Sequence, residues 1–274
     1  MGKITASEVN KLRKMSGAGI MDCKNALVES NGDFELGIEI LRKKGQKVAA
    51  KRAERDSSEG AVIAKVHSSC LRGVVISLNC ETDFVAKNDG FITLANELAK
   101  LALENNSLEE FLNSKIDSMT VSEKLIQQTG VIGEKLVIGS FEKLSAAYVG
   151  KYIHAGNKIA TLSGFSSSIE GIEEIAKNVA MQAAAMNPIA LDESGVDQTT
   201  IDKEIEIAKD QLRQEGKPEK MLDNIAMGKL KRFFKDNTLV NQAFIKDSKQ
   251  SVAAYVKSTN SDLKVTGFKR VALV

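Results

Sequence analysis

The chain has 274 residues, of which 43% are hydrophobic and 27% charged, and its formal net charge is +2. This composition is that of a globular protein and argues against a large basic surface for nucleic acid. It offers no run of about 20 apolar residues that could cross a membrane, and the N-terminus lacks the apolar segment of a secretory signal. Three widely spaced cysteines, Cys23, Cys70 and Cys80, indicate reduced thiols. We therefore expect a cytoplasmic protein.

The first 55 residues predict three short helices. Thr5 and Glu8 have the spacing of a capping box at the start of the first helix. The segment Ser16–Gly19 contains two glycines and should end it, and the second helix should run from about Met21 to Glu29. Asp33 can cap the third helix, whose core stripe comprises Phe34, Ile38 and Leu41.

A basic run follows the third helix between Arg42 and Arg55. We interpret it as a solvated helix tail and linker. The alternative is an electrostatic contact with RNA or with an acidic partner.

From Glu59 the apolar period changes to two, which predicts two strands joined by a turn near Ser68–Arg72. After a connection that begins near Asn79, a helix is expected, with one apolar face that contains Phe91, Leu94, Ala95, Leu98 and Ala102. Two further capping boxes are expected, one at Ser107 and Glu110 and the other at Thr120 and Glu123. A strand is expected within residues 134–144.

Residues 146–165 resemble the first hairpin, and the helix that follows has its small and apolar residues in the same order. We interpret this as an internal duplication of a unit made of a strand hairpin and a helix. Two such units predict an α+β protein with two packed subdomains.

Residues 197–235 show two apolar seams with heptad-like spacing, separated by the turn Gln214–Glu219. They predict a projecting hairpin of two antiparallel helices, with seams formed by Ile201, Ile205, Ala208 and Leu212 and by Leu222, Ala226, Leu230 and Phe233. A short helix is expected in "DSKQSVAAYVKS", and residues 263–274 should form a final strand that completes the second sheet.

Motifs for covalent chemistry are missing from the sequence. It contains neither a GxxxxGK[ST] phosphate loop nor a GxGxxG turn. His67 and His154 occupy equivalent places in the repeat and have no partners at metal-ligand spacing. Cys80 is expected to be a buried thiol at a strand end. We therefore expect a binding protein, without enzyme activity, cofactor or metal.

The connection after Asn79 raises a separate question, because it places the apolar pair Phe84 and Val85 directly behind the acidic Glu81 and Asp83. The residues alone favour a core role for Phe84, under the following helix. The alternative is an exposed binding residue.

Two segments carry a family resemblance: "LRKMSGAGIMDCKNALVESNGDFELGIEILRKKG" (residues 12–45) and "NCETDFVAKNDGF" (residues 79–91). They resemble the N-terminal domain and the core signature of the bacterial elongation factor Ts family. "VIGEKLVI", "YIHAGNKIATL", "QEGKPE" and "VTGFKR" also match in order, so the resemblance spans essentially the whole chain. Some family members continue into a C-terminal helical module, whereas this sequence ends at Val274.

The resemblance implies a guanine nucleotide exchange factor that binds elongation factor Tu carrying GDP, displaces Mg²⁺ and promotes GDP release so that GTP can rebind. Direct binding of nucleotide, nucleic acid or membrane is not expected, while a homodimer or a 2:2 complex stays open. The implied layout is a domain similar to the ubiquitin-associated fold (1–55), a core N-subdomain (56–140), a core C-subdomain (141–195 and 236–274) and an inserted coiled-coil hairpin (196–235).

The resemblance also implies roles for individual residues. Thr82, Asp83, Phe84 and Val85 match the segment that inserts between helices of the partner and dislodges its Mg²⁺. Further partner contacts are implied for Arg13, Ile20, Met21, Ile132 and His154. Leu12 and Leu27 are expected in the core, and His67 is expected to be structural only.

Two other functions compete with this interpretation. The three N-terminal helices could belong to an adaptor for a ubiquitin-like protein. The basic run could instead serve a ribosome- or RNA-binding protein, whose affinity would fall steeply with salt.

Overall fold

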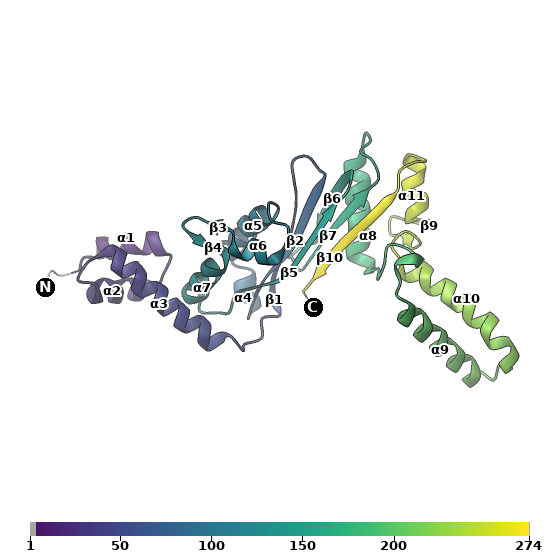
Figure 1. Cartoon of the computed structure of the whole chain (residues 1–274), viewed down its shortest axis with the longest axis horizontal. Helices are drawn as coiled ribbons and strands as arrows, with labels where there is room; N and C mark the ends of the chain where they lie inside the picture. Colours follow the sequence, from purple (N-terminus) through teal and green to yellow (C-terminus); the bar gives the residue numbers. More distant parts are fainter. Residues whose placement is uncertain (1–3, 274) are drawn as a thin grey trace.

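The computed structural model describes residues 4–273 of the chain. Figure 1 shows an elongated molecule, with a helical cluster at the N-terminal end, β-sheets in the middle and a two-helix hairpin that projects from the far end. The combination of helices with antiparallel strands confirms the predicted α+β class.

The N-terminal cluster consists of α1 (Ala6–Ser16), α2 (Ile20–Glu29) and α3 (Phe34–Arg52). α1 begins with the predicted capping box, in which the Glu8 carboxylate accepts the backbone N–H of Thr5 at 2.7 Å. It ends at Gly17, whose φ of 70° lies in the left-handed region that favours glycine. The small core of the cluster contains Val9, Leu12, Ala18, Cys23, Ala26 and Leu27.

Most of the basic run is not a linker, because α3 continues through it as far as Arg52. The second half of α3 packs against α7 (Val121–Ile132). Several basic side chains there also form ion pairs within the chain: Lys43 with Glu39, Lys44 with Asp22, and Arg52 with Glu81. The run is therefore mostly an exposed helix tail, as predicted, and the pairs of Lys44 and Arg52 are contacts inside the molecule that the local charge pattern does not indicate.

Two three-stranded antiparallel sheets form the middle of the molecule. The first has the order β1 (Glu59–Val66), β2 (Arg72–Cys80), β5 (Val137–Ser145); the second has the order β10 (Val265–Ala272), β7 (Ile159–Phe165), β6 (Tyr148–Ile153). The final strand thus completes the second sheet, as predicted. β5 stays in the first sheet as far as Ser145 and so crosses the boundary that we expected between residues 140 and 141.

The sheets pack against each other, and a helix covers the other face of each. α5 (Asp89–Ala102) lies on the first sheet and α8 (Ile172–Met186) on the second. Both faces of each sheet are therefore buried, which explains why the strands carry apolar runs. The core between the sheets contains Val62, Ala64, Val75, Val149, Ala160, Leu162 and Val271.

The hydrogen bonds of the two hairpin turns match the predicted duplication. His67 and His154 each donate their backbone N–H across the turn at 2.9 Å, and each accepts the N–H of the residue three positions later. The fourth residue of each turn, Cys70 or Asn157, has a positive φ. The two histidines therefore hold the same structural place.

Each turn also bonds to the first strand of the other hairpin. Val62 donates to the carbonyl of Asn157, and Val149 donates to that of Cys70, both at 2.7 Å. The donors Val62 and Val149 hold equivalent places before His67 and His154. The acceptors Cys70 and Asn157 hold equivalent places after them. The two units thus hold each other by a reciprocal pair of bonds.

Short elements surround the sheets. In the first half of the core these are α6 (Leu108–Asn113), β3 (Lys115–Ile116) and β4 (Met119–Thr120). The capping box at Thr120 and Glu123 is confirmed. The one predicted at Ser107 and Glu110 is only half formed, because the Glu110 carboxylate accepts the backbone N–H of Asn106 instead of Ser107.

In the second half of the core, the short elements are η1 (Glu193–Gly195), β8 (Ala243–Phe244), β9 (Asp247–Ser251) and α11 (Val252–Thr259). We expected one helix over residues 247–258. The first part of that segment pairs with β8 instead, and the helix starts where the Ser251 hydroxyl accepts the N–H of Ala254.

The projecting hairpin consists of α9 (Gln198–Gln214) and α10 (Glu219–Asn237). Its outer half has the predicted seam of Ala208, Leu212, Leu222 and Ala226. Nearer the sheets, Phe234 is buried together with Ala190, Val196 and Leu230, while Phe233, which we had assigned to the seam, is only partly buried. Phe234 follows Leu230 by four residues, so both lie on the same face of α10.

Candidate functional site

The segment after β2 is a short helix rather than an irregular connection. α4 (Asp83–Ala86) begins after Thr82, whose hydroxyl accepts the backbone N–H of Val85 at 3.5 Å. A helix of only four residues, one aromatic and one β-branched, has little stability of its own. The helix must therefore be held from outside, which explains why the sequence did not reveal it.

Phe84 lies on the outer face of α4 and is 83% exposed. The two residues that follow it face the protein: Ala86 is buried in the first core cluster, and Val85 packs against that cluster. The expectation that Phe84 belongs to the core is therefore wrong. A large aromatic side chain is held in solvent by a helix whose opposite face is anchored.

A carboxylate from the end of α7 holds the start of α4. Glu134 Oε2 accepts the backbone N–H groups of Glu81 and Thr82, at 3.1 and 3.0 Å. Its other oxygen, Oε1, accepts the Thr82 hydroxyl at 2.6 Å. Gly133, with a φ of 81°, ends α7 and lets the chain turn so that Glu134 reaches this position.

A second carboxylate ties α4 to α3. Glu81 accepts the backbone N–H of Lys135 at 2.7 Å, and Arg52 donates to both of its oxygens at 2.8 and 2.9 Å. The Lys135 N–H and the Arg52 guanidinium hold the pKa of Glu81 below its usual value, although partial burial acts against them. Lys135 also donates from its amine to the carbonyls of Ala53 and Arg55.

We name these four residues, Arg52, Glu81, Glu134 and Lys135, the clamp. Sequence reasoning missed the clamp as a unit. The available signals were weak: an acidic residue directly after a helix-ending glycine, and one arginine within a basic run.

Two neighbours complete the surroundings of α4. The Lys87 ammonium, 2.6 Å from the Asp83 carboxylate, holds the pKa of Asp83 below its usual value, and the charge of Lys158 acts in the same direction. Burial, with a smaller effect of the Glu134 charge, raises the pKa of the Cys80 thiol to about 12. Cys80 ends β2 and is fully buried, so it is the inert thiol that we predicted.

Ile132 and Val85 both pack against the first core cluster, and Ile132 ends α7 two residues before Glu134 of the clamp. His154 lies in the β6–β7 turn, where its Nδ1 is 3.0 Å from the Tyr152 hydroxyl. Its ring is exposed, as a contact residue requires. His67 instead has its Nδ1 2.8 Å from the Ser69 hydroxyl of its own turn.

The remaining sequence-predicted residues lie apart from α4, in the N-terminal cluster. Ile20 and Met21 start α2 and are 51% and 63% exposed, and Arg13 on α1 is exposed as well. We name Arg13, Ile20 and Met21 the N-terminal surface. Leu12 and Leu27 are fully buried, as predicted.

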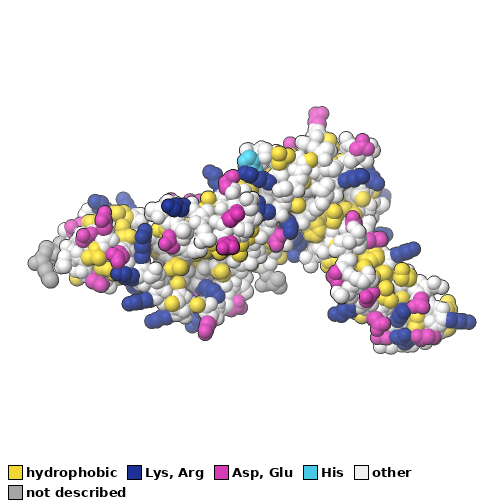
Figure 2. All heavy atoms as spheres, viewed as in Figure 1, with side chains coloured by type: hydrophobic (Ala, Val, Ile, Leu, Met, Phe, Trp, Pro, Cys, Tyr) yellow, Lys and Arg dark blue, Asp and Glu magenta, His cyan; other side chains and the backbone are white. Residues whose placement is uncertain are grey.

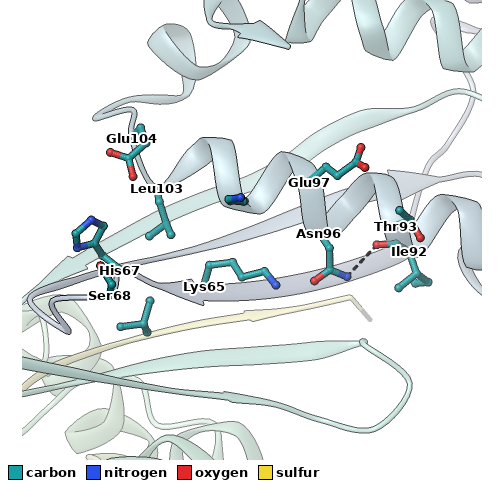
Figure 3. A pocket seen from close by; sticks show the side chains of 11 residues that line it. Lys65, His67, Ser68, Ile92, Thr93, Asn96, Glu97, Leu103 and Glu104 are labelled. Carbon is teal, nitrogen blue, oxygen red and sulfur yellow. Dashed lines mark hydrogen bonds between the residues drawn. The ribbon is translucent and has the colours of Figure 1, made fainter. Parts of the chain in front are cut away.

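A groove of about 690 Å³ lies between β1 and α5 (Figure 3). None of the residues predicted to bind a partner lines it, whereas His67, which is expected to be structural only, does. Some of the groove's polar groups are bonded within the chain. Asn96 donates to the carbonyl of Ile92 at 2.9 Å, and Glu104 pairs with Arg72 at 2.7 Å.

The described residues, 4–273, hold no group of three or more histidine, cysteine or acidic side chains placed to bind a metal ion. Within the same residues, no helix is both long and apolar enough to cross a membrane. Figure 2 shows acidic and basic side chains interspersed over the face in view, without a large basic area.

The fold and the site together define an α+β protein that presents a clamped, exposed aromatic residue and a separate apolar surface, the features of a binding protein. The family model for elongation factor Ts matches residues 81–274. Elongation factor Ts of Christiangramia forsetii is 68% identical, that of Flavobacterium psychrophilum is 67% identical, and each match covers 100% of both chains. That of Porphyromonas gingivalis is 45% identical over 98% of both chains. The chain belongs to the elongation factor Ts family.

Proposed function

We propose that this protein is a guanine nucleotide exchange factor for elongation factor Tu and acts in the cytoplasm during translation elongation. Membership of the family supports the partner. The observation that carries the proposal is Phe84, an aromatic side chain fixed in solvent on a helix that the clamp holds.

An exchange factor needs no catalytic group of its own. It binds the nucleotide-free partner more tightly than the GDP-bound partner, and by linkage GDP weakens the factor's binding to the same extent. A GTPase holds its nucleotide through backbone contacts to the phosphates and a bridging Mg²⁺. Because Mg²⁺ demands near-ideal octahedral geometry, a small displacement of its ligands weakens it strongly.

We assign the displacement step to α4. Phe84 would insert between helices of the partner, with Asp83 beside it, while Thr82 and Val85 keep α4 in place. Ile132 and His154 would add contacts around this insertion. The N-terminal surface would supply affinity at a distance from it, since arginine and large apolar side chains are common at binding hot spots.

The same proposal covers the accessory parts. Residues 1–55 would act as a docking domain similar to the ubiquitin-associated fold, and the hairpin of α9 and α10 would act as a coiled-coil accessory outside the exchange site. No cofactor or metal of the protein's own takes part.

Release of a fluorescent GDP from elongation factor Tu, followed by stopped flow with and without this protein, tests the proposal. We expect the release rate to rise with the concentration of this protein and then to saturate. An unchanged rate at all concentrations would refute the proposed function.

A further inference from the structure

Helices α3 and α7 approach each other closely at two glycines. Gly45 is buried in α3, and Gly130 lies opposite it in α7. A Cβ atom on Gly130 would lie 2.5 Å from the Cα of Gly45, a distance that the two backbones could not accommodate without moving apart. Glycine destabilises the interior of a helix, so two glycines at this crossing indicate that the close approach of the helices offsets that cost.

The two glycines are not equivalent, although they touch. A Cβ on Gly45 would lie 3.5 Å from the carbonyl oxygen of Ile126 and 3.7 Å from the Cα of Gly130, which are ordinary contacts. Alanine should therefore fit at Gly45 but not at Gly130. This asymmetry provides a matched pair of variants.

α3 connects the two parts of the molecule that we propose to bind the partner. Its first half belongs to the N-terminal cluster, where Phe34 and Ile38 pack against the cluster core. Its last residue, Arg52, pairs with Glu81 of the clamp. A helix of 19 residues is roughly 28 Å long, so α3 spans from one surface to the other.

We propose that the Gly45–Gly130 contact is a positioning element that fixes the N-terminal surface relative to α4, so that both engage one partner molecule at once. This inference rests on the proposed function. Two surfaces held at the required separation bind as a pre-organised pair, because the second contact forms without a further search. If the helices separate, each surface keeps its own contacts, but the advantage of joint binding is lost.

Gly130→Ala and Gly45→Ala test the proposal in the full-length chain. For Gly130→Ala we expect the concentration for half-maximal GDP release to rise roughly tenfold or more, since joint binding is weakened. The release rate at saturation should stay near that of the original protein, because α4 is unchanged. Gly45→Ala should match the original protein in both quantities.

A distance measurement provides a readout that does not depend on the partner. Spin labels on Glu35→Cys in α3 and Lys100→Cys in α5, with Cys70→Ser, report the placement of the N-terminal cluster on the core. We expect a narrow distance distribution that broadens in Gly130→Ala and stays narrow in Gly45→Ala. Gly45→Leu, which alters only α3, should reproduce the broadening and so exclude a defect of α7 itself.

The possible failures can be told apart. If the original protein does not accelerate GDP release, the proposed function fails, whatever the labels show. If it does, and Gly130→Ala behaves like Gly45→Ala in the distance distribution or in half-maximal concentration, the positioning role is refuted. If Gly130→Ala lowered only the release rate at saturation and left the half-maximal concentration unchanged, the positioning role would also be refuted, because the defect would then lie in α4.

Discussion

Replacing Phe84 by alanine separates a binding role from a structural one. Fully burying a phenylalanine contributes about 1.5–3 kcal/mol, and truncating one in a core costs about 3–5 kcal/mol. Phe84 is 83% exposed, so truncation should change the free energy of unfolding by only about 0.5 kcal/mol. We therefore expect Phe84→Ala to melt at nearly the same temperature as the original protein.

The effect on exchange should be much larger. An aromatic side chain at a binding hot spot contributes about 2 kcal/mol or more, which corresponds to a roughly thirtyfold slower catalysed release of GDP. The defect should shrink when Mg²⁺ is chelated, because chelation replaces part of what the insertion does. Asp83→Asn is the matched control, since it removes the charge of α4 and keeps its shape.

The assay measures thermal melting and GDP release on the same samples at several Mg²⁺ concentrations. A large fall in melting temperature with normal exchange per folded molecule would show that Phe84 stabilises the fold, contrary to its exposure. Normal melting with normal exchange would show that α4 does not act on the partner.

Four further outcomes are expected. Glu134→Ala should leave the backbone N–H groups of Glu81 and Thr82 without their acceptor, a loss of about 1–3 kcal/mol. The amide hydrogens of α4 should then exchange faster and GDP release should slow, and unchanged amide exchange would contradict the clamp. Ile20→Ala combined with Met21→Ala should raise the half-maximal concentration roughly tenfold or more with normal melting, and full potency would exclude a docking role. Because the pKa of Glu81 is lowered in the folded state, its stabilisation is present above its unfolded pKa and is lost as pH falls through the folded value. Glu81→Gln should thus lose less stability than the original protein between neutral and acidic pH, and equal losses in denaturant titrations would disprove this. Replacing residues 207–227 by a short Gly-Ser loop removes the outer half of the hairpin and keeps its buried base. The core should then melt as before and exchange should continue, because closing a shorter loop costs little. A complete loss of exchange in a folded variant would refute the accessory role of the hairpin.

Local signals in the sequence were enough for most of the fold. The capping box at Thr5, the glycine stop at Gly17 and the apolar runs of β1 and β2 depend on neighbours along the chain, so each could be located without tertiary information. The duplication was visible for the same reason, since the repeat preserves the order of residues in each hairpin.

The candidate site was predicted less completely, because its geometry depends on distant residues. The segment around Phe84 was found only through the family resemblance, and the residues alone favoured the wrong environment for it. α4 exists because Glu134, far along the chain, accepts hydrogen bonds from Thr82, the residue that caps it. The ion pair of Arg52 could not be predicted from the basic run for a similar reason, since its partner Glu81 lies beyond β2.

The second sheet also sets an order of events during synthesis on the ribosome. β10 pairs with β7, yet α8, both hairpin helices and α11 lie between them in the chain. The first sheet can close as soon as β5 has emerged, while one edge of β7 waits unpaired until all these helices have followed. We expect this open edge to be the point at which the nascent chain is most prone to aggregate, and premature termination before β10 to leave it exposed.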